Sequence, residues 1–234
     1  MNIKGKERVV PLLQKKICSR KRNDIIFANA VRFFMGITER RIRQKEEVRS
    51  AILETAWKLV EAEGWQSLSI RKIADAIEYS VPVIYDHFKN KEAILFEFVK
   101  EGFRMLGAKL LAAKEKQTTE EEQIRAMADA YWNFAFKNQE HYQLMFSLGM
   151  AGCEMGQIMP EKAAFRNVLV EPIELLLKKH NKTNVNPCLK YHTIWSVMHG
   201  LISIKMMNKS DVSDELNKMV LDDAVNGFIK NLKG

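Results

Sequence analysis

Apolar residues recur at helical spacing along most of the chain. Between Glu46 and Glu63 they are separated by steps of three and four residues, and the run stops at Gly64. The apolar positions in this run are Val48, Ile52, Ala56, Leu59 and Val60. The spacing predicts a helix over 46–63 that is closed by a left-handed glycine. Residues 1–44 show no sustained period, so we expect an arm there with a short helix around 25–34.

Two short helices joined by a tight turn are predicted next. The first has apolar residues at helical spacing, which are Ile70, Ile73, Ala74 and Ile77. Ser69 precedes this helix and is predicted to cap it with its hydroxyl. Ser80 is predicted to cap the second helix in the same way. That helix is expected over Val81–Phe88, because Pro82 then lies in the first turn, where its missing N–H would have no partner in any case.

A longer helix is predicted over Lys91–Lys114, with Asn90 as its N-cap. Its apolar side is formed by Ile94, Leu95, Phe98, Phe103 and Leu106. Further helices are expected at about 119–137, 139–151, 161–180, 188–208 and 213–232. Pro172 should kink or split the third of these helices. A turn is expected at Gly149, Gly152 and Gly156. The chain contains only 11 Gly and 5 Pro, which also favours an all-α fold over a turn-dense β fold.

Composition limits the class of protein further. The 234 residues are 47% hydrophobic and 28% charged, which is typical of a soluble globular chain with one or two domains. No apolar run reaches the length of a membrane span, and no secretory signal is recognisable. The 3 cysteines (Cys18, Cys153 and Cys188) form no C-x-x-C pair, so we expect neither disulfides nor a thiolate zinc site, and a cytoplasmic protein.

The net charge of +8 lies entirely in the N-terminal part of the chain. Residues 1–50 hold 14 Lys or Arg and 5 Asp or Glu, a net of +9, so the remaining residues carry 23 basic and 24 acidic side chains, a net of −1. A localised positive segment attracts polyanions, so nucleic acid and an anionic membrane surface are both candidate partners. Composition alone does not choose between them.

Two short helices joined by a tight turn and packed on a preceding helix form a helix-turn-helix. In this arrangement the second helix fills the major groove of DNA, and flanking Lys, Arg, Tyr and Ser side chains bind phosphates. Any helical bundle contains short helices joined by turns, so periodicity alone leaves a purely structural interpretation open. The residues themselves are more specific.

From Leu68 to Ile94 the chain reads LSIRKIADAIEYSVPVIYDHFKNKEAI, preceded by Gly64 and Trp65. This segment resembles the DNA-binding domain of the tetracycline-repressor (TetR) family of transcriptional regulators. The resemblance implies an all-helical homodimer with an N-terminal helix-turn-helix domain and a C-terminal ligand-binding and dimerisation domain. It also implies binding to a palindromic operator, usually as a repressor, and release when a small molecule enters the C-terminal domain.

The resemblance assigns DNA-binding roles to individual residues. The residues implied to contact bases or phosphates are Ser69, Arg71, Ser80, Val81, Pro82, Val83, Tyr85, His87 and Lys91. Val81 and Val83 are apolar where many relatives place polar side chains, so we expect readout to rest on thymine methyls and DNA shape. Glu78 occupies a turn position where Gly is common, and some backbone strain is expected there.

A second resemblance concerns the C-terminal half. The segments AYWNFAF (130–136), HYQLMF (141–146) and WSVMHG (195–200) resemble the ligand-binding domain named for its W, H and G residues. The residues predicted to line a cavity for a small apolar or amphipathic effector are Phe134, Met145, Phe146, Trp195, Met198 and His199. Packing in an ordinary core remains the alternative for each of them.

The last two helices resemble the pair that forms the four-helix dimer interface in this family. Their apolar residues include Val197, Leu201, Ile204, Val220, Ala224 and Ile229. The sequence therefore predicts a homodimer through these helices. No catalytic motif, metal site or cofactor site is recognisable, so we expect no enzyme: His192 and His199 have no matching ligands, and Cys153 has no activating partner.

The expected domains are a basic extension over 1–36, a DNA-binding domain over 37–90 and an effector and dimerisation domain over 91–234. The extension either reaches along DNA or precedes a natural start at Met35, and we favour the second hypothesis. The alternative function is a helical adaptor that uses the basic arm to bind proteins or an anionic membrane surface, and a helical enzyme is a more remote third. The expected partners are therefore duplex DNA, a small effector and a second copy of the chain, and not a membrane.

Overall fold

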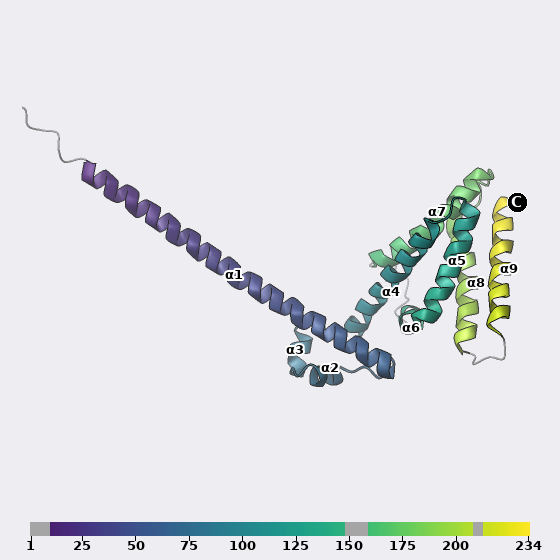
Figure 1. The fold of residues 1–234 in the computed structure, drawn as a ribbon, viewed down its shortest axis with the longest axis horizontal. Coiled ribbons are helices and arrows are strands. Elements are labelled where there is room, and N and C mark those ends of the chain that lie inside the picture. The colour runs from purple at the N-terminus through teal and green to yellow at the C-terminus, as the bar shows by residue number, and fades with distance from the viewer. Residues whose placement is uncertain (1–9, 148–158, 208–212) are drawn as a thin grey trace, which may run out of the picture. The chain divides into compact units, whose positions relative to one another are not determined.

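The computed structural model describes residues 10–147, 159–207 and 213–234, and every regular element within them is a helix (Figure 1). The prediction of an all-α fold is confirmed. The helices are α1 Val10–Glu63, α2 Ile70–Ala76, α3 Val81–Tyr85, α4 Lys91–Lys114, α5 Glu120–Lys137, α6 Gln139–Ser147, α7 Pro160–Lys179, α8 Pro187–Met207 and α9 Asp214–Lys233. The turn predicted at Gly149, Gly152 and Gly156 and the side chain of Cys153 lie outside the described residues.

The chain divides into two compact units, and the boundary falls inside α1, between Thr55 and Ala56. In the first unit, α1 is continuous from Val10, so the prediction of one short helix around 25–34 is wrong. The segment lacks an amphipathic period, so periodicity does not predict a helix there. It is nevertheless rich in Lys and Arg, which favour helix, and it contains no proline after Pro11.

The second unit holds the remaining helices close to their predicted bounds. α4 begins at Lys91 and ends at Lys114, as predicted. Asn90 caps α4, since its Oδ1 accepts a hydrogen bond from the Ala93 amide at 2.9 Å. Pro172 lies inside α7 without splitting that helix, and its ring is buried. Helix ends marked by caps, prolines and glycines are therefore well predicted here.

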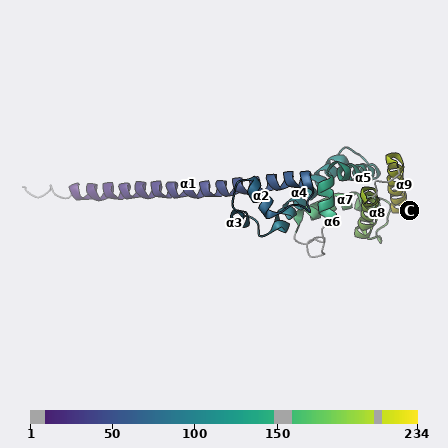
Figure 2. The same cartoon turned by 90° about the horizontal axis from the view of Figure 1, so that it is seen from below.

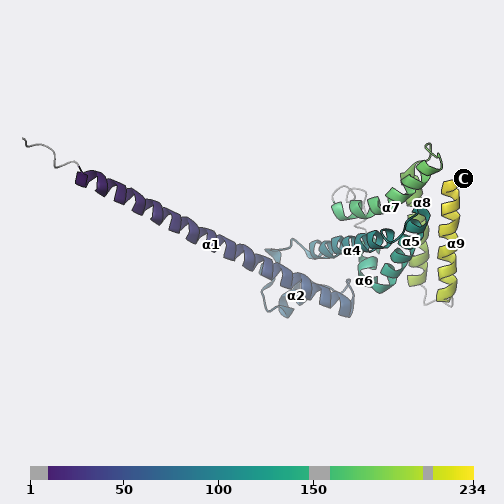
Figure 3. The same cartoon turned by 45° about the horizontal axis from the view of Figure 1, so that its top comes forward.

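α4 is central to the packing of the C-terminal helices. It packs against α5, α6 and α7, and Figure 3 shows it between α6 and α7. The residues predicted to form its apolar side are all buried: Ile94, Leu95, Phe98, Phe103 and Leu106. α8 and α9 pack against each other at the C-terminal end, and each also contacts α5 and α7 (Figure 2).

Candidate DNA-binding surface and effector cavities

The first part of the helix-turn-helix forms through local capping and a strained turn. The Ser69 hydroxyl accepts a hydrogen bond from the Lys72 amide at 3.2 Å, which confirms the predicted cap of α2. Ile73 and Ala74 are buried. In the turn, Glu78 has a φ of 58°, a conformation in which a side chain is strained and glycine is not. The strain predicted at this position is therefore present.

α3 follows at Ser80, with Pro82 in its first turn as predicted. The Ser80 hydroxyl makes no capping hydrogen bond, so this part of the prediction is wrong and the hydroxyl remains available to another partner. α3 also ends at Tyr85 rather than Phe88. The carbonyl of Ile84 accepts from the amides of both His87 and Phe88, at 3.1 and 2.9 Å, and this tight turn ends the regular helix.

α3 has one buried face and one exposed face. Ile84 is fully buried and Phe88 is 5% exposed, so these two side chains anchor the segment. On the other side, Pro82 is exposed and Tyr85 is 52% exposed, while Val81 is half-buried. α3 lies beside α2 (Figure 1). The fold therefore presents the N-terminal part of α3 to solvent.

The polar side chains that flank this face differ in exposure and in hydrogen bonding. Arg71 on α2 is exposed. His87 is half-buried, and its Nδ1 is buried with no hydrogen-bond partner among the described residues. The Lys91 ammonium donates to the carbonyl of Gln66 at 3.0 Å, which holds it in place while other N–H groups remain. Tyr79, which sequence reasoning missed, is 46% exposed at the end of the turn.

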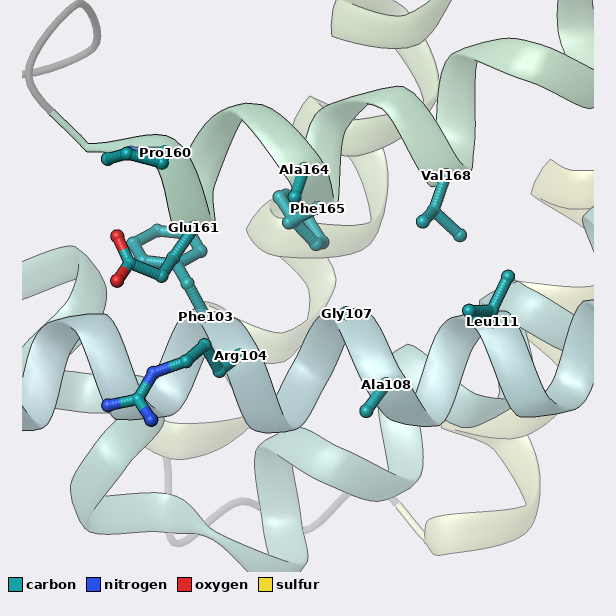
Figure 4. A pocket seen from close by; sticks show the side chains of 10 residues that line it. All are labelled: Phe103, Arg104, Gly107, Ala108, Leu111, Pro160, Glu161, Ala164, Phe165 and Val168. Carbon is teal, nitrogen blue, oxygen red and sulfur yellow. The ribbon is translucent and has the colours of Figure 1, made fainter.

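An apolar groove lies between α4 and α7. Its volume is about 390 Å³, and its lining includes Phe103, Ala108 and Leu111 of α4 and Ala164, Phe165 and Val168 of α7. Figure 4 shows Arg104 and Glu161 at the end of the groove near Pro160. Sequence reasoning did not assign these residues to a ligand site, because the groove exists only once α4 and α7 pack together.

The predicted effector residues divide into a core set and an aromatic cluster. Phe134, Met145 and Met198 are buried. Phe146, Trp195 and His199 lie together: the Phe146 and His199 ring centroids are 4.8 Å apart, and Trp195 stacks on His199 with centroids 5.2 Å apart and planes inclined by 7°. Among them, Phe146 and His199 line a cavity of about 290 Å³ between α6 and α8.

Two tyrosines join this cluster, and sequence reasoning missed both. Tyr142 Oη lies 2.6 Å from His199 Nδ1 and 3.2 Å from Tyr131 Oη. Burial raises the pKa of both tyrosines and lowers the pKa of His199, so all three side chains are neutral near pH 7. Tyr142 stands between His141 and Gln143 in the sequence, so no local apolar pattern marked its hydroxyl as buried.

His141, the neighbour of Tyr142, faces a different element. Its ring lies 3.9 Å from that of Trp57, measured between centroids, in the C-terminal part of α1. Burial lowers the pKa of His141, and the carboxylates of Glu101 and Glu61 partly oppose that shift. Its Nε2 is buried with no hydrogen-bond partner among the described residues.

α8 and α9 expose apolar side chains that no described residue covers. Those at least 44% exposed are Leu189, Val197, Ile204 and Met207 on α8 and Leu216, Met219 and Val220 on α9. A Cβ built at Gly200 or Gly227 would meet no atom of the described chain within 4 Å, so these glycines offer room for close approach. Ile229 is 2% exposed, so it belongs to the core and not to this face.

A helix-turn-helix whose second helix is exposed, followed by helices that enclose ligand-sized cavities, is typical of a DNA-binding transcriptional regulator. None of the helices in the described ranges combines the length and apolar character needed to cross a membrane. Residues 52–113 match the family of bacterial regulatory proteins of the tetR family. Residues 124–224 match the tetracyclin repressor-like C-terminal domain. The chain belongs to the TetR family of transcriptional regulators.

Individual relatives are distant. The HTH-type transcriptional regulator Rv0681 of Mycobacterium tuberculosis is 22% identical over 170 residues, which cover 71% of this chain and 73% of the relative. A protein of Rhodococcus sp. RHA1 shares the fold with a TM-score of 0.68 and 22% identity over 80% of this chain and 95% of its own. A TetR/AcrR-family regulator of Thermobifida fusca aligns with a TM-score of 0.58 and 20% identity, covering 77% of this chain and 98% of its own.

Proposed function

We propose that this TetR-family regulator is a repressor that binds a palindromic operator as a homodimer and is released by a small-molecule effector. The observation that carries the proposal is the exposed face of α3, where Pro82 and Tyr85 face solvent while Ile84 and Phe88 fix the segment from below. A helix held in this way can enter the major groove without unfolding its own domain.

Each predicted DNA-binding residue has a role that suits its exposure. Val81, Pro82 and Val83 meet base edges, where apolar side chains recognise thymine methyls. The groups assigned to phosphates are the hydroxyls of Ser69, Ser80 and Tyr85, the imidazole of His87 and the cations of Arg71 and Lys91. The Ser69 hydroxyl oxygen already accepts a hydrogen bond from the Lys72 amide, so Ser69 contacts a phosphate by donating its own hydroxyl hydrogen.

The homodimer uses the apolar face of α8 and α9. Helix pairs that bury such faces form four-helix interfaces, and exposed apolar patches of this kind are uncommon on monomers. Gly200 and Gly227 permit close approach of the partner's helices. Dimerisation would place two copies of α3 about 34–36 Å apart, the separation of successive major grooves.

The effector binds among α4, α6, α7 and α8. The groove between α4 and α7 and the cavity between α6 and α8 border one aromatic layer, since the Phe103 and Phe146 ring centroids are 5.8 Å apart. α4 begins at Lys91, directly after the helix-turn-helix segment, so a ligand that shifts α4 changes the spacing of the two α3 helices. Effector and operator affinities are then reciprocally linked.

The operator is found by selecting bound fragments from a library of random duplexes. We expect a two-fold symmetric site, and a reporter carrying it next to a promoter distinguishes repression from activation. Tyr85→Phe should weaken binding by roughly 12- to 150-fold per contact, the loss of one hydrogen bond to a charged phosphate oxygen. Tyr191→Phe makes the same chemical change on α8 and should leave operator affinity unchanged. An asymmetric site, or equal affinity of the Tyr85→Phe and wild-type proteins, would contradict the proposal.

A further inference from the structure

Three polar side chains form a continuous hydrogen-bonded chain through the apolar interior of the C-terminal helices. Tyr131 of α5 is 3.2 Å from Tyr142 of α6, measured between hydroxyl oxygens. The Tyr142 hydroxyl is 2.6 Å from Nδ1 of His199 on α8. Tyr131 and Tyr142 are 0% and 2% exposed, so their hydroxyls are shielded from bulk water. Each hydrogen in this chain must therefore find an acceptor within it.

The requirement fixes the direction of the hydrogen bonds. If His199 donated to Tyr142 and Tyr142 donated to Tyr131, the hydrogen of Tyr131 would have no acceptor among the described residues. A buried unpaired donor is costly. In the opposite direction, Tyr131 donates to Tyr142 and Tyr142 donates to Nδ1 of His199, so both hydrogens are paired. The hydrogen of the neutral imidazole is then on Nε2.

Among the described residues, the Nε2–H group of His199 has only a weak partner. Ser203 Oγ lies 3.5 Å away, at the outer limit for a hydrogen bond. The imidazole and Ser203 both line the cavity of about 290 Å³ between α6 and α8. Phe146, Met206 and Met207 supply apolar lining, and stacking on Trp195 holds the imidazole ring. The cavity thus combines an oriented donor with adaptable apolar walls.

We propose that this cavity binds an uncharged amphipathic molecule through a carbonyl oxygen, such as that of an amide, ester or ketone, which accepts from His199 Nε2. The inference rests on the proposed function, because it names the chemical class of the effector. The apolar part of the ligand lies against Phe146, Met206 and Met207.

The charges around the cavity favour a neutral ligand over an anion. No Lys or Arg is among the described residues that line it. The nearest cation along α8, Lys205, pairs with Asp214 and lies over the rings of Trp132 and Phe136, 5.7 and 5.3 Å from their centroids. Burial lowers the pKa of His199, so the imidazole does not supply a positive charge at neutral pH. A carboxylate would lose its hydration without gaining a counter-charge.

The test compares three ligands that share one alkyl chain: octanamide, octanoate and octylamine. Isothermal titration of the full-length dimer at pH 7.5 should show that octanamide binds at least about 10-fold more tightly than octanoate or octylamine, because both ions are desolvated without a partner. The inference is overturned if octanoate or octylamine binds as tightly as octanamide, or if octanamide does not bind at its solubility limit.

Variants test the role of His199 itself. His199→Phe keeps an aromatic ring and removes the donor, so it should weaken octanamide binding by roughly 2- to 12-fold. His199→Gln restores an N–H donor and should recover part of that loss. His192→Phe makes the same change at an exposed position of α8 and should have no effect. Unchanged affinity of His199→Phe would refute the contact. If His199→Phe does not fold, the octanamide affinity of His199→Gln and the three-ligand comparison test the contact instead.

Failure of the inference and failure of the proposed function give different results. Operator affinity is measured in the same samples by fluorescence anisotropy. If octanamide binds through His199 without changing operator affinity, the ligand class stands and effector release is wrong. If octanoate releases the operator equally in the wild type and in His199→Phe, release stands and the assignment of a neutral carbonyl to this cavity is wrong.

Discussion

Removal of the Tyr142 hydroxyl tests the hydrogen-bonded chain inside the C-terminal helices. Tyr142→Phe leaves two groups unpaired, the hydroxyl of Tyr131 and Nδ1 of His199. Each unpaired buried group costs about 1–3 kcal/mol, and His199 is only half-buried, so we expect a loss of about 2–4 kcal/mol in the free energy of unfolding. Tyr131→Phe removes only the terminal donor and should cost about 1 kcal/mol.

The double variant Tyr131→Phe/Tyr142→Phe gives the sharpest result. It leaves only His199 unpaired, so it should be more stable than Tyr142→Phe alone by about 1 kcal/mol, although it carries one more substitution. Urea unfolding followed by far-UV circular dichroism, at one fixed protein concentration, measures all three variants. Tyr79→Phe, at an exposed position, is the control and should change stability by less than about 0.5 kcal/mol. Additive losses in the double variant would refute the reasoning.

Three further outcomes are expected. Ile84→Ala removes the buried anchor of α3, so operator binding should fall sharply, with a stability loss of about 2–5 kcal/mol by urea unfolding, while gel filtration still shows a dimer. Because burial lowers the pKa of His141 below its ordinary 6.5, the unfolded chain binds a proton first as pH falls. Stability should therefore be complete above pH 6.5 and decline below it, and His141→Phe should reduce that decline whereas His192→Phe should not. Val220→Asp places a charge on the apolar face of α8 and α9 and should yield monomers in sedimentation analysis, whereas Ala112→Asp, at an exposed position of α4, should not.

The helix bounds were predictable where a local chemical signal marks them. Asn90 fixes the start of α4, and Gly64, with a φ of 78°, ends α1 as predicted. The start of α1 at Val10 was not predictable from periodicity, because no buried stripe is needed for a helix that depends on residue propensity. The hydroxyl of Ser80 shows the opposite error, since a residue of the correct type at the N-cap makes no capping bond.

The candidate sites also differ in whether a local sequence signal marks them. The position of α3 was predictable because the helix-turn-helix lies within 27 residues and its signals are local. The bond between Tyr142 and His199 joins residues 57 positions apart, and the groove between α4 and α7 joins Phe103 and Phe165. No pattern within one helix indicates which face of a distant helix it will meet. Sequence therefore identified His199 and Phe146 as candidates but not the partner that orients the imidazole.

α6 connects the cavity beside His199 to α1 through the adjacent residues His141 and Tyr142. Tyr142 bonds His199, and Phe146 lines the cavity beside it. His141, which immediately precedes Tyr142, lies against Trp57 of α1, the helix that precedes the helix-turn-helix. Neighbouring residues on a helix move together, because the backbone hydrogen bonds between them are fixed. Under the proposed function, a ligand that displaces Tyr142 would therefore also act on the contact between His141 and Trp57, so no long pathway to the helix-turn-helix would be required.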